Sequence, residues 1–541
     1  MLSDRWVVIA ATAAFIGALV PLPVPWLAAA TAVSVALVWE RPRLLVVSLF
    51  VLTAALAVDS PQSTVITTGE IEATYEVVAD GVRWGGGGRT ELERDGVRYE
   101  ASGWGAAGAR LRDRLVGQTV VVVGQVRPST GSRWHEWRGI DATVSVQQVV
   151  SWRPASGLAG IANQIRGTLD SGASSLSIDD KALFLGIVIG DDREMSMLVE
   201  DDFRAAGLTH LVAVSGQNVA FVLIVVGPLL RRLDYRSRWL ALLGVLLLFG
   251  VITRFEPSVV RATAMAAVAA SATALGRETS ALRTLSLAVV AALLWQPALA
   301  HSLGFRLSLA ATAGILFLSP WLISVLPGPR IFREASGVTI GAQVAVAPML
   351  VATFGSIPVA SLPANLLVGP VAGPVMLWGL TAGPLAGIFG GVFAEVAHRP
   401  TSWGAGWMRY VAQQAAVAPF GQLTVAHLIA GSVAVGGALV VGKRRLAGAV
   451  AVVILSLPSL VFVRTQPGRI EPETGLAITW SGEVAVEIDE QASLRVLLPA
   501  LRHNGIRQID VLIIHGNADR IDDVAGLVGA RHAISVLVTD G

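Results

Sequence analysis

Residues 201–225 read DDFRAAGLTHLVAVSGQNVAFVLIV, a charged segment that continues directly into a long apolar run. Four polar side chains interrupt the first turns of the apolar run: His210, Ser215, Gln217 and Asn218. An unpaired polar group at membrane depth is costly, so such groups face a bundle interior, a cavity or a conduction path. The segment therefore predicts a functional membrane helix, and a purely packing role is the alternative for His210.

Composition supports a membrane location. The 541 residues are 53% hydrophobic and 15% charged, and the mean hydropathy is +0.63, which excludes a soluble globular enzyme. The net charge of +2 provides no global basic field, so any attraction for phosphate must come from local clusters. Because the chain has no Cys, thiolate metal sites are excluded as well. We expect no cofactor.

Residues 207–219, GLTHLVAVSGQNV, resemble the signature of the ComEC-type competence channel family. These are polytopic bacterial membrane proteins thought to conduct single-stranded DNA inward during natural transformation. The common family form has Leu-His where this chain has Gln217 and Asn218. The resemblance implies three partners, namely single-stranded DNA, the lipid bilayer and other DNA-uptake proteins such as a cytoplasmic helicase and a DNA receptor.

Three further segments are similar to motifs of the same family. Residues 257–262, PSVVRA, resemble its Pro-Ser-x-x-Arg-Ala motif, and residues 304–308, GFRLS, resemble its Gly-Phe-Gln-Leu-Ser with Arg306 in place of Gln. A looser match follows the spacing of its last block. The resemblance implies that these side chains line the path: His210, Ser215, Gln217, Asn218, Ser258, Arg261, Arg306, Gln343 and Asn365.

A path for a polyanion through hydrocarbon needs fixed positive charge and hydrogen-bond donors. Arg261 and Arg306 are the obvious suppliers. An ion pair between Arg261 and Glu256, or an arginine that snorkels to the headgroups, is the alternative.

The expected fold is a polytopic α-helical membrane protein with two small soluble parts. Residues 1–59 predict three membrane segments, since a cleaved signal peptide would account for the first apolar run alone. Residues 154–206 predict interfacial helices, and about ten spans follow in the channel domain, residues 207–464. Tract 360–395, rich in Gly and Pro, is compatible with two spans or with re-entrant pieces. Arginine-rich loops predict that both soluble segments are extracytoplasmic on the inner membrane.

Residues 60–153 alternate between apolar and polar positions, and Gly-rich turns separate the runs, which predicts a small β domain. It falls where the family carries an OB-like domain, a fold that binds single strands through basic grooves and stacked aromatics. Core tryptophans with a solvated charged face are the alternative. The candidate DNA-binding residues are Arg83, Trp84, Trp104, Arg110, Arg112, Arg114, Trp134 and Trp137.

Residues 465–541 resemble the opening of a metallo-β-lactamase-type domain. Its metal motif His-x-His-x-Asp-His is reduced here to His515 and Asp519, with Asn517 and Arg520 at the other two positions. We therefore expect a degenerate, truncated segment without a metal and without enzymatic activity.

The sequence favours an inner-membrane channel for single-stranded DNA uptake. A membrane-tethered metal-dependent nuclease that acts on incoming DNA is one alternative. A carrier of small solutes or lipids on the same scaffold is the other.

Overall fold

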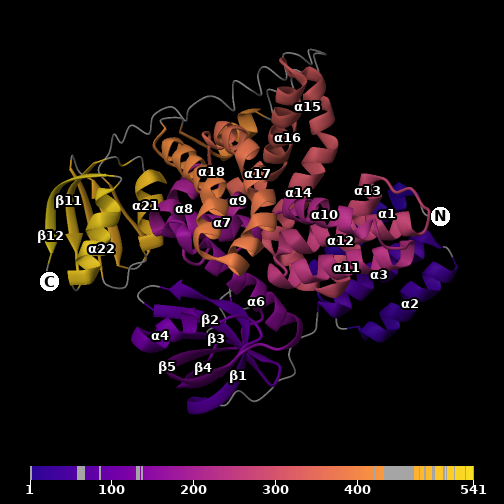
Figure 1. Ribbon diagram of the computed structural model, residues 1–541, viewed down its shortest axis with the longest axis horizontal. Helices are drawn as coiled ribbons and strands as arrows, with labels where there is room; N and C mark the ends of the chain where they lie inside the picture. The colour runs from indigo at the N-terminus through magenta and orange to yellow at the C-terminus, as the bar shows by residue number, and fades with distance from the viewer. Residues whose placement is uncertain are drawn as a thin grey trace.

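The computed structural model of this chain contains a β-barrel, a large helical part and an α/β tail. Figure 1 shows the barrel below the helices, the tail at the left and the N-terminal helices at the right. The structure describes residues 3–22, 24–39, 41–57, 68–84, 87–129, 135, 138–418, 421–431, 468–473, 475–480, 483–489, 494–503, 506, 508–516, 518–530 and 532–539.

Three helices come first: α1 (Asp4–Leu19), α2 (Trp26–Val38) and α3 (Pro42–Leu56). Helices α1 and α3 approach closely, because a Cβ atom at Gly17 would lie only 2.3 Å from the carbonyl oxygen of Phe50. The three helices have 16, 13 and 15 residues. Each is shorter than the about 20 residues that a membrane-crossing helix needs.

A closed five-stranded barrel follows, and a β domain in this region is confirmed. Its elements are β1 (Gly69–Trp84), β2 (Gly87–Arg94), β3 (Val97–Trp104), α4 (Gly105–Arg112), β4 (Thr119–Pro128) and β5 (Ala142–Arg153). The strand order is β1-β2-β3-β5-β4, with β3 and β5 parallel and the other recorded pairs antiparallel. Alternate residues of each strand point into the core around Tyr75 and Leu92.

Strand β1 is irregular in its middle. Its pairing with β2 shifts register between Val77 and Ala79 and again between Ala79 and Val82. Such bulges bend a strand and redirect a side chain. Here the irregularity contains Asp80.

Short helices connect the barrel to the helical part: α6 (Gly157–Gly172), η1 (Ala173–Ser175), α7 (Ile178–Ile189), α8 (Met197–Ala205) and α9 (Thr209–Val212). Every residue of α7 from Ala182 to Ile189 is buried. A helix that is apolar on all sides requires protein around it, and α7 accordingly forms the centre of the junction.

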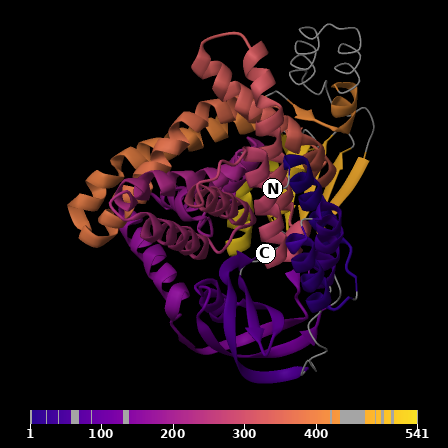
Figure 2. The ribbon, with the colours of Figure 1, turned by 90° about the vertical axis from the view of Figure 1, so that its right-hand side faces the viewer.

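The remaining helices are α10 (Gly216–Leu230), α11 (Tyr235–Ile252), α12 (Pro257–Ala274), α13 (Ala281–Trp295), η2 (Pro297–His301), α14 (Leu303–Phe317), α15 (Ser319–Val325), α16 (Arg330–Phe354), α17 (Ser361–Phe389) and α18 (Gly391–Val417). A two-stranded sheet pairs β6 (Ile357–Pro358) with β7 (Gln422–Leu423). Helices α17 and α18 pack along each other, as the orange ribbons on one flank of Figure 2 show.

Among the described residues, four helices are long and apolar enough to cross a membrane: Thr209–Leu230, Tyr235–Ile252, Arg330–Phe354 and Ser361–Phe389. Helices α14 and α15, bent by 46°, make a fifth if they act as one span. About ten spans were predicted for residues 207–464. Fewer occur among the described residues of that region, because the apolar helices α13 and α14 have only 15 residues each, and residues 432–464 lie outside the described residues. Tract 360–395 contains one long helix, α17, despite its three internal prolines.

The tail contains a five-stranded sheet with the order β12-β11-β10-β9-β8. Its elements are β8 (Gly468–Glu473), β9 (Leu476–Trp480), β10 (Val484–Ile488), α21 (Leu494–His503), β11 (Gln508–Ile514), α22 (Ala518–Gly529) and β12 (Ala533–Thr539). Strands β10, β11 and β12 are parallel. Met197 and Leu198 of α8 pack against its core, which attaches the tail to the helical part.

Candidate functional site

The start of α10 is the centre of the predicted site. Ser215 stands at the N-cap position but does not cap the helix with its side chain. Its Oγ donates instead to Oδ1 of Asn218 (3.1 Å), and Nδ2 of Asn218 donates to the carbonyl of Ile187 in α7 (2.8 Å). In the described part of the chain no hydrogen bond satisfies the backbone N–H groups of Gly216 and Gln217. These groups give the helix end a partial positive charge.

Arg261 of α12 lies beside this helix end. The residue is only 8% exposed, yet its contacts are neutral: Nε donates to Ser308 Oγ (2.7 Å) and Nη1 to Met265 Sδ (3.0 Å). Nη2 lies so close to Gly216 that a Cβ atom there would come within 2.6 Å of it. The described residues supply no carboxylate within ion-pair distance of Arg261.

The ion pair with Glu256, considered as an alternative for Arg261, is not seen. The charged groups whose fields act on Glu256 are Asp192 and Arg138. A buried charge without a counter-ion is costly. The Arg261 guanidinium lies against Gly216, at the helix end where the N–H groups of Gly216 and Gln217 have no recorded acceptor among the described residues. Such an arrangement is suited to bind an anion.

Several predicted residues gather around this centre. Ser258 Oγ donates a short hydrogen bond to the carbonyl of Val214, which ties α12 to the residues before α10. Gln217 lines a cavity of about 760 Å³ between α10 and α17, together with Phe221, Gly373 and Trp378. His210 is exposed on α9.

Gln343 and Asn365 form a second group around one serine. Nε2 of Gln343 donates to Ser361 Oγ (2.5 Å), and Nδ2 of Asn365 donates to the Ser361 carbonyl (2.8 Å). Gly207, the first residue of the signature, packs against the same serine, and a Cβ atom there would lie 2.5 Å from Ser361 Cβ. These contacts hold α16 and α17 against the start of the signature segment.

Arg306 has a local role in the structure. Its Nε donates to the carbonyl of Ala300 in η2 (2.6 Å). Arg261 and Arg306 therefore differ, because Arg306 stabilises a turn on its own side of α14 whereas Arg261 faces another helix.

The sequence prediction missed a buried cluster between the barrel and the helices. Asp80 Oδ2 accepts from Arg166 Nη2 (3.1 Å) and Arg254 Nε (2.9 Å), and Asp191 Oδ2 accepts from the same Arg166 atom (2.7 Å). Arg193 binds both oxygens of Asp191, at 2.6 and 2.8 Å. The charged run 191–194 was the visible signal, but its partners are distant in the sequence.

Asp191 has a perturbed pKa within this cluster. Burial by itself raises the pKa, but the hydrogen bonds from Arg193 and the charge of Arg166 outweigh it and lower the pKa to about 2. The same contacts raise the pKa of the Arg193 guanidinium against the effect of its burial. Asp191 and Arg193 are therefore both ionised over the physiological range.

The barrel presents an aromatic pair. The rings of Trp84 and Trp104 lie 5.4 Å apart at 43°, with exposures of 42% and 61%, and the Arg89 guanidinium lies 5.9 Å from the Trp84 ring. Arg83, which precedes Trp84 in β1, is also exposed. The sequence prediction had missed Arg89, which is adjacent only through the pairing of β1 with β2.

The other predicted barrel residues are scattered. Arg110 donates to the Val149 carbonyl (2.7 Å), and Arg112 is exposed near Asp113. Arg114 is buried and its guanidinium lies 4.3 Å from the Trp152 ring, so it is part of the packing. Trp134 and Trp137 lie outside the described residues.

In the tail, His515 Nε2 lies 3.5 Å from Glu487 Oε1. The side chain of Asp519 lies outside the described residues. No group of three or more His, Asp or Glu side chains suited to hold a metal ion occurs among the residues that the structure describes.

Comparisons with known proteins agree on the helical part. Residues 187–445 match the family model described as "Competence protein". The chain is 25% identical over 407 residues to "ComE operon protein 3" of Bacillus subtilis (strain 168), covering 68% of this chain and 51% of that protein.

Two uncharacterized proteins are also similar. One is YcaI of Escherichia coli (strain K12), with 25% identity over 203 residues, 35% of this chain and 27% of that protein. The other is from Aquifex aeolicus (strain VF5), with 28% identity over 197 residues, 36% of this chain and 45% of that protein.

The chain thus spans about half or less of the length of these relatives. No solved structure shows significant similarity to it. The family match and the apolar helices together identify a multi-pass membrane protein. The chain is thus similar to the competence protein family over residues 187–445.

Proposed function

We propose that this protein conducts single-stranded DNA inward across the cytoplasmic membrane during natural transformation. Similarity to the competence protein family supports a role in DNA uptake. The observation that carries the proposal is Arg261, a buried guanidinium with neutral partners that lies against Gly216 at the N-terminus of α10.

A phosphodiester satisfies this arrangement chemically. Its oxygens accept hydrogen bonds from Arg261 Nη2 and from the backbone N–H groups of Gly216 and Gln217, and its charge neutralises the guanidinium. These contacts would therefore replace part of the hydration that a phosphate loses when it enters hydrocarbon. The cavity beside Gln217 adds apolar and aromatic surface, from Phe221 and Trp378, next to the same helix end.

The barrel is proposed to be an OB-like domain that receives the strand. Its closed five-stranded topology and the helix between β3 and β4 support this assignment. Exposed Trp84 and Trp104 provide ring faces on which bases stack, and Arg89 provides positive charge beside Trp84.

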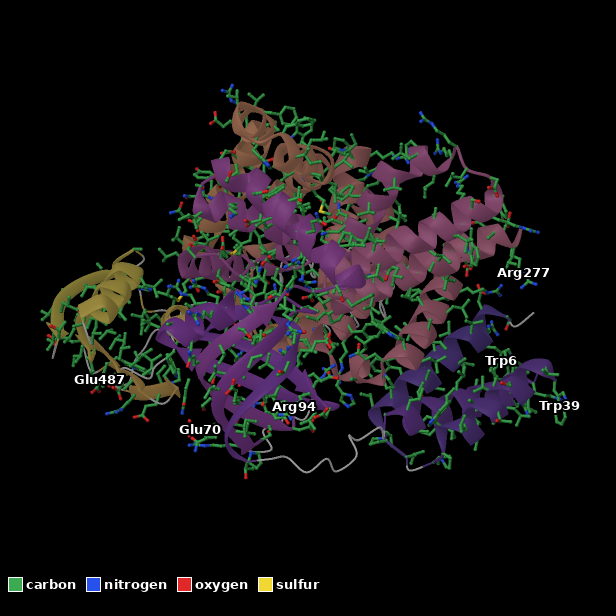
Figure 3. All side chains as sticks on the ribbon, turned by 60° about the horizontal axis from the view of Figure 1, so that its bottom comes forward. Trp6, Trp39, Glu70, Arg94, Arg277 and Glu487 are labelled. Atoms are coloured by element: carbon green, nitrogen blue, oxygen red, sulfur yellow. The ribbon has the colours of Figure 1, made fainter. Side chains whose placement is uncertain are left out.

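Both soluble parts are proposed to lie outside the cell. Arg283 Nη2 pairs with Asp4 Oδ1 at 2.7 Å, so the chain start adjoins an arginine of a loop predicted to be cytoplasmic. Figure 3 shows Trp6, Trp39 and Arg277 at one end of the molecule, away from Glu70 and Arg94 on the barrel. This separation supports opposite sides for the barrel and the arginine-rich loops.

The tail is proposed to be a catalytically inactive metallo-β-lactamase-like segment. Three parallel strands with two helices support the likeness. A nuclease would need a metal that His515 and Asp519 could hold only with further ligands, and His515 is paired with Glu487. A helicase on the cytoplasmic side and a DNA receptor outside are the proposed protein partners.

The test measures import of labelled DNA into cells, separately from DNA bound at the surface, beside the amount of protein in the membrane. We expect Arg261→Ala to abolish import at a normal protein level, and Arg261→Lys to retain part of it because the charge remains but the planar fork is lost. Arg306→Ala is the matched control, since among the described residues that guanidinium donates to the local carbonyl of Ala300 alone.

Two results would contradict the proposal. Normal import with Arg261→Ala would exclude a role for this guanidinium in conduction. Unchanged DNA import after deletion of the whole gene would instead favour a carrier of small solutes or lipids.

A further inference from the structure

Asp80 is the barrel residue on which two arginines of the helical part converge. Its Oδ1 accepts the backbone N–H of Val116 within the barrel (2.8 Å), while Oδ2 accepts from Arg166 (3.1 Å) and Arg254 (2.9 Å). The side chain is 10% exposed. The bulge in β1 that redirects this side chain therefore brings a barrel carboxylate into the helical part.

Arg254 lies in the connector between α11 and α12, where the backbone is strained. Arg254 and Phe255 both have positive φ, 57° and 51°, although neither is glycine. Such backbone is unfavourable for residues with a Cβ and persists only where the surroundings hold it. The contacts that hold Arg254 are Asp80 and the side chain of Asn163, whose Oδ1 accepts from Nη2 at 2.6 Å.

Asp80 also acts on the other end of the connector through Arg166. Nη1 of Arg166 donates to the carbonyl of Ile252, the last residue of α11, at 2.9 Å. The two guanidiniums oriented by Asp80 thus fix the end of α11 and the connector that follows it.

The connector leads directly into the site. Helix α12 begins at Pro257, and one turn later it carries Arg261. Ser258 Oγ donates to the Val214 carbonyl just before α10, so the first turn of α12 sets the distance between Arg261 and the α10 N-terminus. A shift of the connector would move the guanidinium relative to Gly216.

We propose that Asp80 is a positioning residue, through which the barrel fixes the start of α12 and aims Arg261 at the N-terminus of α10. The effect of Asp80 on DNA import rests on the proposed function, whereas its effect on the position of Arg261 does not. Trp84 lies four residues further along β1, about 13 Å away along an extended strand. Strand β1 therefore carries both Trp84, one member of the aromatic pair, and the carboxylate that positions the membrane site.

The experiment uses the absence of cysteine from the chain. Ala262→Cys introduces one thiol next to Arg261, at a residue that is 8% exposed and whose Cβ lies 3.3 Å from the position of a Cβ on Gly216. The rate of its modification by a water-soluble maleimide is measured in the purified full chain. We expect Asp80→Asn, which keeps the shape of the side chain, to raise this rate several-fold.

Asp95→Asn is the matched control. Asp95 is a barrel carboxylate that is paired with Arg94 at the surface and is 78% exposed. We expect it to leave the modification rate unchanged. An unchanged rate in Asp80→Asn would overturn the proposal.

A double variant separates positioning from charge balance. Asp80→Asn leaves two buried guanidiniums with less counter-charge, which lowers the amount of folded protein. Asp80→Asn combined with Arg254→Gln removes one charge of each sign. The amount of folded protein should therefore recover, while the rate of thiol modification should stay raised. A return of the modification rate to the parental value would show that charge balance alone matters and would refute positioning.

The same variants are assayed for DNA import. We expect import to fall in Asp80→Asn and in the double variant but not in Asp95→Asn. If Arg261→Ala imports DNA normally, the proposed function fails, yet the thiol measurement still decides the positioning because no DNA takes part in it.

Discussion

A side chain at position 216 and the guanidinium of Arg261 compete for the same space, since a Cβ atom on Gly216 would come within 2.6 Å of Arg261 Nη2. Real Cβ atoms do not make contacts this short, so one of the two must move. The absence of a side chain at Gly216 is what lets the guanidinium lie against the end of α10. This relationship makes the site testable without removing its charge.

Gly216→Ala is expected to displace the guanidinium and to reduce DNA import strongly, with little change in the amount of membrane protein. Alanine is a better helix former than glycine, so α10 itself should not be weakened. Gly227→Ala on the same helix is the control, because a Cβ atom there meets nothing within 4 Å. Equal import by the two variants would argue against the close approach at Gly216.

Removing the aromatic pair is expected to weaken binding of single-stranded DNA. Because base stacking on an aromatic ring contributes about 1–3 kcal/mol, Trp84→Ala or Trp104→Ala in the purified full chain should lower oligonucleotide affinity about tenfold or more. Trp26→Ala is the control, since Trp26 is 53% exposed on α2. The affinity of the parental protein should fall as salt rises, because binding releases counter-ions from the phosphates. An oligonucleotide affinity that changes neither with these tryptophan substitutions nor with salt concentration would contradict a docking role for the barrel.

The cluster around Asp191 is expected to make the protein sensitive to acid. The folded-state pKa of about 2 lies below the ordinary value of 3.8, so the ionised carboxylate stabilises the fold above that ordinary value. This stabilisation, about 2 kcal/mol by linkage, is lost as the pH falls from about 4 to about 2. Thermal unfolding in detergent at pH 5, 4 and 3 should show a steeper loss of Tm in the parental chain than in Asp191→Asn.

Asp234→Asn is the comparison for this measurement, because the Asp234 carboxylate is at the surface and its loss should leave the steep pH dependence in place. A parental Tm that does not change between pH 5 and pH 3 would show that the Asp191 cluster does not contribute as inferred.

The tail is expected to be inert towards metals and DNA. Purified protein incubated with Zn²⁺ or Mn²⁺ should lose the metal on gel filtration and should not cut single-stranded DNA, because the expected ligands are reduced to His515 and Asp519. Cleavage that disappears with His515→Ala would reverse this expectation and favour the nuclease alternative.

The sequence by itself determined features that depend on neighbouring residues. The alternation of apolar and polar residues between 60 and 153 predicted a β domain, and strands run there from Gly69 to Arg153. The polar residues of the signature indicated a site at the start of an apolar helix, and Ser215 does stand at the N-cap of α10. Such features are local, so period and turn chemistry along the chain suffice to find them.

Only the tertiary structure decided which charges meet. Arg254 and Asp80 are far apart in the sequence but form an ion pair. The alternative that paired Arg261 with Glu256 considered only the nearest carboxylate along the chain. Gln343 and Asn365 meet through Ser361, and Trp84 meets Arg89 through strand pairing. A charge or a hydrogen bond acts over a few ångströms of space whatever the separation along the chain, so these partners exist only once the barrel and the helices have packed together.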